Sequence, residues 1–316
     1  MKRPLIGLIG AGLLTTGILV ATASDPGSPD SNGSMLFSKE KAALATQTLP
    51  EPVMSVANEA NLTSATPLYG EYTAERTMYG YTNVYYLPGT VTITAGSGNN
   101  EINIRNLAGN DETVKATVNL SDNTVNIPGG SDFGTTPDGD VLKGYYVDYD
   151  VMKYDPSRPI TGKILNNGVI QFQKGMMFLS VQGPNQGGQI MVTSEEISKL
   201  NATAVNTSLM FDNPEPQKIH VRRTSQGSIM IKNFYGIIGT SIKATLDSVG
   251  NVSLNTGSNV LKVGTTTYKN YAVKTLDETT PANCVMEGTS VKMKGKYEGN
   301  TITFGQWGLA AGTAKT

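Results

Sequence analysis

The residues of this chain best suited to chemistry are aspartates in one short stretch, Asp138-Gly-Asp140 and Asp148-Tyr-Asp150. On a β-strand, residues two apart share a face, with Cα atoms about 6.5 to 7 Å apart. That separation suits a pair of glycosidase carboxylates. Such a pair normally comes from different elements of a deep cleft, and the sequence indicates no cleft. A solvated strand face is therefore the favoured interpretation, ahead of a weak Ca²⁺ or polar-ligand site, and catalysis is the least favoured.

Tyrosines crowd the same half of the chain, at Tyr69, Tyr72, Tyr79, Tyr81, Tyr85, Tyr86, Tyr145, Tyr146, Tyr149 and Tyr154. Strands favour tyrosine for packing, but its rigid ring and polar tip also suit a binding surface. Alternation places Tyr146, Asp148 and Asp150 on one strand face. If the protein binds a ligand, we expect these three residues to contact it, with Tyr85 or Tyr86 beside them.

Few other residues could catalyse a reaction or bind a metal ion, because His220 is the only histidine and Cys284 the only cysteine. They cannot supply the usual ligands of a closed zinc site, and Asp138-Gly-Asp140 lacks the rest of a calcium-binding EF-hand loop. His220 lies in an alternating stretch that predicts a strand. We expect no catalytic residue, no metal site and no cofactor, and we expect the protein not to be an enzyme.

The charge balance indicates which partners to expect. The chain has 25 basic and 26 acidic residues, with no sustained basic patch. Nucleic acid is therefore an unexpected partner. If the modules present a binding surface, we expect a glycan or a surface protein as the partner.

The N-terminus predicts export. Lys2-Arg3 precedes an apolar run from Leu5 to Val20, and Ala21-Thr-Ala23 supplies the small residues that a signal peptidase reads. We predict a signal peptide over residues 1–23, cleaved after about Ala23, and a flexible Pro- and Ser-rich spacer over 24–66. A membrane anchor is the alternative for residues 1–23, but the run is short and rich in glycine. We expect no transmembrane segment in the mature chain, which would be secreted or held in the cell envelope, in the periplasm or on the outer surface.

Beyond the spacer, apolar and polar residues alternate with a period of two, as in Thr90–Thr94, Val114–Val118 and Thr124–Ile127. These stretches predict half-buried strands. They end at turn sequences such as Ser121-Asp-Asn-Thr124, where Asn tolerates a positive φ. Strands about ten residues apart predict an all-β fold of antiparallel meanders, closed into barrels or folded into sandwiches.

The chain also repeats itself. Glu101–Gly109 returns as Ser228–Gly236, and Val114–Val118 returns as Ile242–Leu246. Later blocks match in the same order, Ile160–Ile164 with Met293–Tyr297 and Val169–Phe172 with Thr301–Phe304. The repeat predicts two tandem β modules, over 67–192 and 216–316. Residues 193–215 are predicted to be a linker with a short helix, because Thr193-Ser-Glu-Glu196 resembles a capping box. We expect residues from about 210 to 316 to fold without the first copy.

The second copy carries Asn233-Phe-Tyr-Gly236, Ile242-Lys-Ala-Thr-Leu246 and Gly305-Gln-Trp-Gly308. These motifs resemble the β-rich repeat modules of secreted and outer-surface proteins of Bacteroidota. The first copy departs from them, with Leu107-Ala108 in place of the aromatic pair. The resemblance implies a secreted or envelope β protein and transfers no catalytic residue. Trp307 is expected to be a core residue rather than a platform for a sugar.

Together these observations predict a non-catalytic secreted or cell-surface protein whose tandem modules present a binding or structural surface. Two alternatives stay open. One is a lipocalin-like carrier that encloses a small apolar ligand in each barrel. The other is a carbohydrate-active enzyme that uses the region of Asp148.

Overall fold

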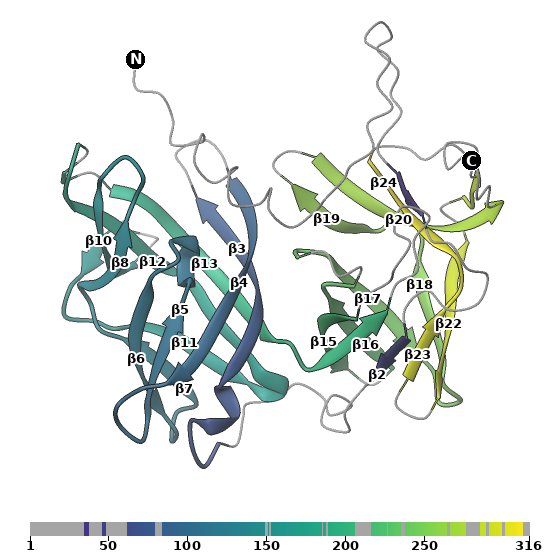
Figure 1. The fold of residues 1–316 in the computed structure, drawn as a ribbon, viewed down its shortest axis with the longest axis horizontal. Coiled ribbons are helices and arrows are strands. Elements are labelled where there is room, and N and C mark those ends of the chain that lie inside the picture. The colour runs from purple at the N-terminus through teal and green to yellow at the C-terminus, as the bar shows by residue number, and fades with distance from the viewer. Residues whose placement is uncertain are drawn as a thin grey trace, which may run out of the picture.

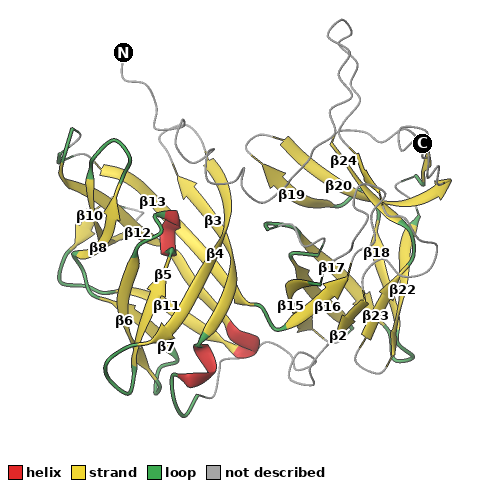
Figure 2. Ribbon diagram, viewed as in Figure 1, coloured by secondary structure: helices red, strands yellow, loops and turns green. Residues whose placement is uncertain are grey.

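The computed structural model confirms the all-β fold class, and its strands form barrels rather than sandwiches (Figure 1). It describes residues 35–37, 46–48, 62–79, 84–148, 151, 153–184, 186–187, 189–205, 216–225, 227–234, 238–263, 266–275, 285–288, 291–298 and 301–311. Helical structure in this part of the chain is limited to single turns, drawn red in Figure 2: η3 (Thr66–Leu68), η4 (Leu107–Gly109) and η5 (Asn166–Gly168). None of its helices is long and apolar enough to span a membrane.

The first body is one antiparallel sheet of eleven strands. Its members are β3 (Gly70–Tyr79), β4 (Val84–Ala95), β5 (Glu101–Arg105), β6 (Thr113–Asn119), β7 (Thr124–Ile127), β8 (Ser131–Thr135), β9 (Val141–Asp148), β10 (Lys153–Asp155), β11 (Ile160–Leu165), β12 (Val169–Gln182) and β13 (Gln189–Lys199). The sheet curls on itself, because β12 pairs with β11 on one side and with β13 on the other. The strands therefore follow one another around a ring in the order β12-β11-β7-β6-β5-β4-β3-β13.

The second body contains a closed barrel of β14 (Ala202–Val205), β15 (Gln217–Ser225), β16 (Ser228–Lys232), β17 (Ser241–Leu246), β18 (Asn251–Asn255), β22 (Lys292–Glu298), β23 (Thr301–Phe304) and β2 (Thr46–Thr48). A smaller sheet adjoins it, built from β1 (Met35–Phe37), β24 (Trp307–Ala311), β20 (Thr266–Thr275), β19 (Asn259–Val263) and β21 (Val285–Met286). Two of these strands, β1 and β2, come from the N-terminal part of the chain. Their purple ribbons lie among green and yellow strands in Figure 1.

The matched sequence blocks occupy matching places in the two rings. Strands β5 and β6 pair with Ile102 opposite Ala116, and β16 and β17 pair with Ile229 opposite Ala244. Likewise β11 and β12 pair with Gly162 opposite Phe172, as β22 and β23 pair with Gly295 opposite Phe304. Each pair of blocks thus has the same register in both barrels.

Alternation along each strand decides which side chains fill the interior. Val114, Ala116 and Val118 are buried while Lys115 is exposed, and Lys243 is exposed on β17 in the same way. This confirms the predicted facing, since a register slip of one residue would bury the lysine. The predicted turn conformations are also confirmed, with φ of 52° at Asn123.

An ion pair lies inside the first barrel. Arg76 Nε and Nη2 donate to the two carboxylate oxygens of Glu195 at 3.0 and 2.8 Å, and both side chains are almost fully buried. The backbone N–H of Ala108 also donates to this carboxylate, at 2.9 Å. Ala108 has a φ of 64°, so the pair anchors a backbone turn that L-residues rarely adopt. Buried charges need this degree of hydrogen bonding to be tolerated.

The two bodies meet at a polar junction. Lys232 of β16 is 2 % exposed and forms ion pairs with Glu75 of β3, at 3.0 Å, and with Glu196 of β13. Beside them, Thr73 Oγ1 donates to Asn233 Oδ1 at 2.7 Å. Burial raises the pKa of Glu196, but the charge of Lys232 and its hydrogen bond lower it more, so the net pKa lies below its ordinary value. Glu196 is therefore ionised at neutral pH and the junction is held by charge.

The predicted short helix from Thr193 is wrong, because residues 193–199 continue strand β13 of the first sheet. The capping-box pattern is overridden by alternation. Thr193, Glu195 and Ile197 are buried. The Glu195 carboxylate points inward because it pairs with the buried Arg76. The predicted spacer also differs from the structure where β1 and β2 form. A fragment of residues 210–316 would therefore omit β2 and β14, two strands of the second ring.

Candidate functional site at the fork between β9 and β11

A fork in the first sheet creates the candidate site. Strand β12 pairs with β11 through Val169–Phe172 and then with β9 from Met176 onward. The register shift between Phe172 and Met176 separates the two halves. Strands β11 and β9 therefore diverge on the same side of β12, and the space between their ends is not closed by strand pairing.

A pocket of about 300 Å³ lies at this fork. Its lining comes from β9, β11, β12 and the turn before β11, namely Tyr146, Arg158, Pro159, Ile160, Thr161, Lys163, Gln171 and Gly175. Two of these side chains are cationic and none is acidic. The pocket therefore combines one aromatic ring with positive charge.

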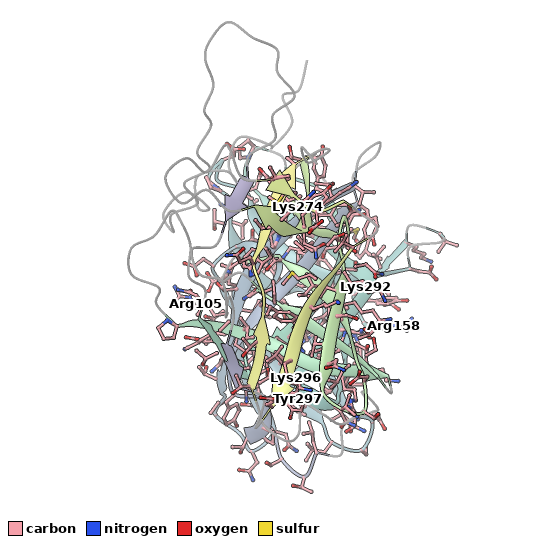
Figure 3. All side chains as sticks on the ribbon, turned by 90° about the vertical axis from the view of Figure 1, so that its right-hand side faces the viewer. Arg105, Arg158, Lys274, Lys292, Lys296 and Tyr297 are labelled. Atoms are coloured by element: carbon pink, nitrogen blue, oxygen red, sulfur yellow. The ribbon has the colours of Figure 1, made fainter. Side chains whose placement is uncertain are left out.

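Arg158 and Tyr146 form the central contact of the site. The guanidinium carbon of Arg158 lies 3.8 Å from the centroid of the Tyr146 ring, within the range of a cation–π interaction. Arg158 is exposed to solvent and is labelled near the edge of the molecule in Figure 3. A guanidinium stacked on a ring still presents N–H donors in its own plane, which suits a planar anionic group.

The turn before β11 positions Arg158. The carboxylate of Asp155 accepts hydrogen bonds from the backbone N–H and the hydroxyl of Ser157, at 2.9 and 2.6 Å. These bonds hold the pKa of the exposed Asp155 carboxyl below its usual range, so the turn is closed by a carboxylate at neutral pH. Pro159 follows Arg158 and restricts the backbone further. The backbone that carries Arg158 is thus held by local turn chemistry.

Of the four predicted ligand residues that the structure describes, Tyr146 alone lines this pocket. Asp148 is exposed at the end of β9, opposite Lys153 of β10, and is not a lining residue. Asp150 lies outside the described residues. Tyr85 is half-buried and Tyr86 is exposed on β4, which is separated from β9 by β3, β13 and β12 in the sheet. The predicted aromatic and acidic cluster is therefore replaced here by an aromatic and basic one.

Sequence reasoning missed Arg158 and Lys163. Both are ordinary basic residues, Arg158 just before the repeated block Ile160–Ile164 and Lys163 within it, and no spacing rule connects them with Tyr146. The contact arises because β12 changes partner between Phe172 and Met176. A weak signal was present in Pro156-Ser-Arg-Pro159, whose two prolines restrict the backbone around Arg158.

The other candidates have structural roles. His220 is fully buried at the junction of the barrels, with Nδ1 2.6 Å from the carbonyl oxygen of Lys199. Burial lowers the pKa of His220 to about 3, so the ring is neutral. Asp140 is fully buried and accepts a hydrogen bond from Ser180 Oγ at 2.9 Å. Trp307 is a core residue, as predicted, and packs against Phe234.

Within the described residues, no group of three or more His, Cys, Asp or Glu side chains is placed to hold a metal ion. No family model, curated protein or solved structure matches the chain.

Proposed function

We propose that the protein is a non-catalytic binding protein, secreted or exposed on the cell surface, whose fork pocket binds an acidic sugar unit of a glycan. The observation that carries the proposal is the stacking of Arg158 on Tyr146 beside Lys163 in a pocket of about 300 Å³. That volume is at the lower end of the range for small-molecule sites and suits one sugar ring. The guanidinium supplies in-plane donors for a carboxylate or sulfate, and Lys163 adds a second positive charge.

The proposed layout is a tandem repeat of two barrels behind a signal peptide. The equal registers of β5 with β6 and of β16 with β17 support a duplication. The polar junction around Lys232 supports a rigid pair of modules rather than two independent ones. Export, and the resemblance to Bacteroidota surface modules, stay predictions from the sequence.

The carrier alternative is less well supported. The first interior is occupied by side chains that are almost fully buried, among them Tyr72, Phe172 and Ile104, and the second by Phe234, Phe304 and Ile231. A lipocalin-like lumen needs an unfilled apolar space at this position. The enzyme alternative relied on Asp148, which is exposed on a strand end.

A glycan array probed with the mature full-length chain tests the proposal. We expect retention of glycans that carry uronic, sialic or sulfated sugars and no retention of their neutral counterparts. Arg158→Gln should abolish retention, whereas Arg105→Gln, at an exposed arginine paired with Asp111, should not. Equal retention of acidic and neutral glycans, or equal loss in both variants, would overturn the assignment.

A further inference from the structure

A second opening lies in the other barrel, where two neighbouring strands separate. Strand β16 pairs along the whole of β17, from Ser228 with Thr245 to Lys232 with Ser241. On its other side β17 pairs with β18 only at Thr245 and Leu246. Residues 241–244 therefore face a wedge in which no described strand pairs with them.

The wedge contains a pocket of about 470 Å³. Its lining is mostly aliphatic, hydroxyl and amide: Ser228, Met230, Ser241, Ile242, Lys243, Ala244, Thr245, Leu254, Asn255, Ser258, Asn259, Val260 and Asn270. Among these described lining residues Lys243 is the one that is charged, and none is aromatic. The pocket wall therefore offers mainly hydroxyl and amide groups beside aliphatic side chains.

Asn270 is the wall residue of the wedge with an unsatisfied buried group. The residue is 1 % exposed, and its Oδ1 has no hydrogen-bond partner among the described residues. An unsatisfied buried amide oxygen destabilises a fold by about 1 to 3 kcal/mol. Such a group in a pocket wall is accounted for if a ligand supplies the missing donor.

The backbone of β17 offers a second set of hydrogen-bonding groups. The N–H of Leu246 donates to Gly227, and the carbonyl of Thr240 accepts from Asn233, both on the β16 side. Because backbone groups alternate sides along an antiparallel strand, the N–H and C=O of Ser241 and Lys243 point into the wedge. This edge has the pattern that an incoming strand requires.

The first barrel serves as an internal comparison. There β6 pairs with β7 only from Thr117 onward, so the same two strands separate. Strand β8 lies beside β6 and buries Phe133 fully in the first core, 4.8 Å from the Phe178 ring. Strand β19 lies beside β17 in the corresponding way and buries the smaller Val260 in the second core.

We propose that the wedge between β17 and β18 binds an extended, uncharged peptide segment, which pairs with the edge at Ser241 and Lys243 and donates a backbone N–H to Asn270. A peptide fits better than a saccharide because the described lining residues include no ring on which a sugar could stack and have amide groups that match a peptide backbone. The proposal is independent of the fork pocket, which lies in the other barrel.

The test uses the full-length chain and a phage-displayed library of short random peptides, followed by affinity measurement on synthetic copies of the selected sequences. Lys243→Pro removes the N–H that faces the wedge together with the lysine side chain, and Lys115→Pro makes the same change at the matching position of the first barrel. We expect Lys243→Pro to weaken peptide binding about tenfold or more and Lys115→Pro to leave it unchanged. Arg158→Gln should also leave it unchanged.

Asn270→Leu is the second variant, in case the proline disturbs the barrel. We expect it to abolish peptide binding while the melting temperature stays the same or rises, because an amide whose oxygen is buried without a partner is replaced by an apolar group of similar size. A lowered melting temperature would show that the amide already has a structural partner and would overturn the proposal. Selected peptides that bind Lys243→Pro and Asn270→Leu normally, or a glycan that competes at this wedge, would overturn it as well.

Discussion

Arg76 and Glu195 form a two-pronged ion pair in the interior of the first barrel, with N–O distances of 3.0 and 2.8 Å. The strands that carry them, β3 and β13, are neighbours, and Glu195 lies opposite Arg76 in their register. The same carboxylate also accepts the backbone N–H of Ala108 in a turn with a positive φ. One pair therefore links two strands of the ring and one strained loop.

We expect Glu195→Gln to destabilise the first barrel by about 3 to 5 kcal/mol, because a buried guanidinium loses its countercharge. The double variant Arg76→Met with Glu195→Leu should recover most of this loss. Arg105→Gln breaks an exposed pair with Asp111 and should change the free energy of unfolding far less. Urea unfolding followed by circular dichroism measures all three, and a Glu195→Gln chain as stable as the parent would contradict the expectation.

Stability should fall between pH 7 and pH 5 because of His220. The unfolded imidazole binds a proton below about pH 6.5, whereas burial lowers the pKa of the folded one to about 3. The unfolded state then binds more protons, so acid favours it, and the expected loss is about 2 kcal/mol by pH 5. In His220→Asn the side-chain amide can replace the hydrogen bond between Nδ1 and the Lys199 carbonyl oxygen. This variant should lose the dependence of stability on pH between pH 5 and pH 7.

His220 and Glu196 affect the stability of the fold in different pH ranges. The folded pKa of Glu196 is depressed, so its contribution is present above its unfolded pKa of about 4.3 and is lost only below it. Measurements between pH 5 and pH 7 therefore report mainly on His220. An unchanged slope in His220→Asn would show that another group is responsible.

The N-terminal strands should stabilise the second barrel. Strand β2 closes the ring between β14 and β23, and β1 pairs with β24, which carries the only tryptophan, Trp307. Deleting residues 24–48 should therefore lower the urea midpoint seen by tryptophan fluorescence and leave the first barrel intact. Deleting residues 24–33, before β1, is the matched control. If both deletions behave alike, the closing strands add nothing to stability.

The strands and their facing could be predicted because alternation is a local property, as Lys115 and Lys243 illustrate. Closure of the second barrel could not be predicted, since it depends on β2, which is far from β14 and β23 in sequence. The Arg76–Glu195 pair could be predicted in part from the sequence. Arg76 falls on the inward face with Tyr72 and Ala74, and an inward charge needs a buried partner. The contact of Arg158 with Tyr146 depends on the change of partner within β12, which no local pattern encodes.

The last prediction concerns Tyr146. Tyr146→Ala should weaken binding of the acidic glycan about tenfold or more, because it removes the ring on which Arg158 is stacked. Tyr154→Ala is the matched control, since Tyr154 is exposed on the adjacent strand β10 and does not line the pocket. Isothermal titration measures affinity for both variants, and a thermal melt shows whether each is folded.

Tyr146 is half-buried on β9, opposite the buried Met176, so its loss could also affect packing. Arg158→Gln separates the two roles, because it removes the cation and leaves the ring in place. If Tyr146→Ala and Arg158→Gln weaken binding equally while both melt near the parent temperature, the ring acts by orienting the guanidinium. If Tyr146→Ala unfolds the first barrel and Arg158→Gln binds normally, Tyr146 is a packing residue and the fork pocket is not the binding site.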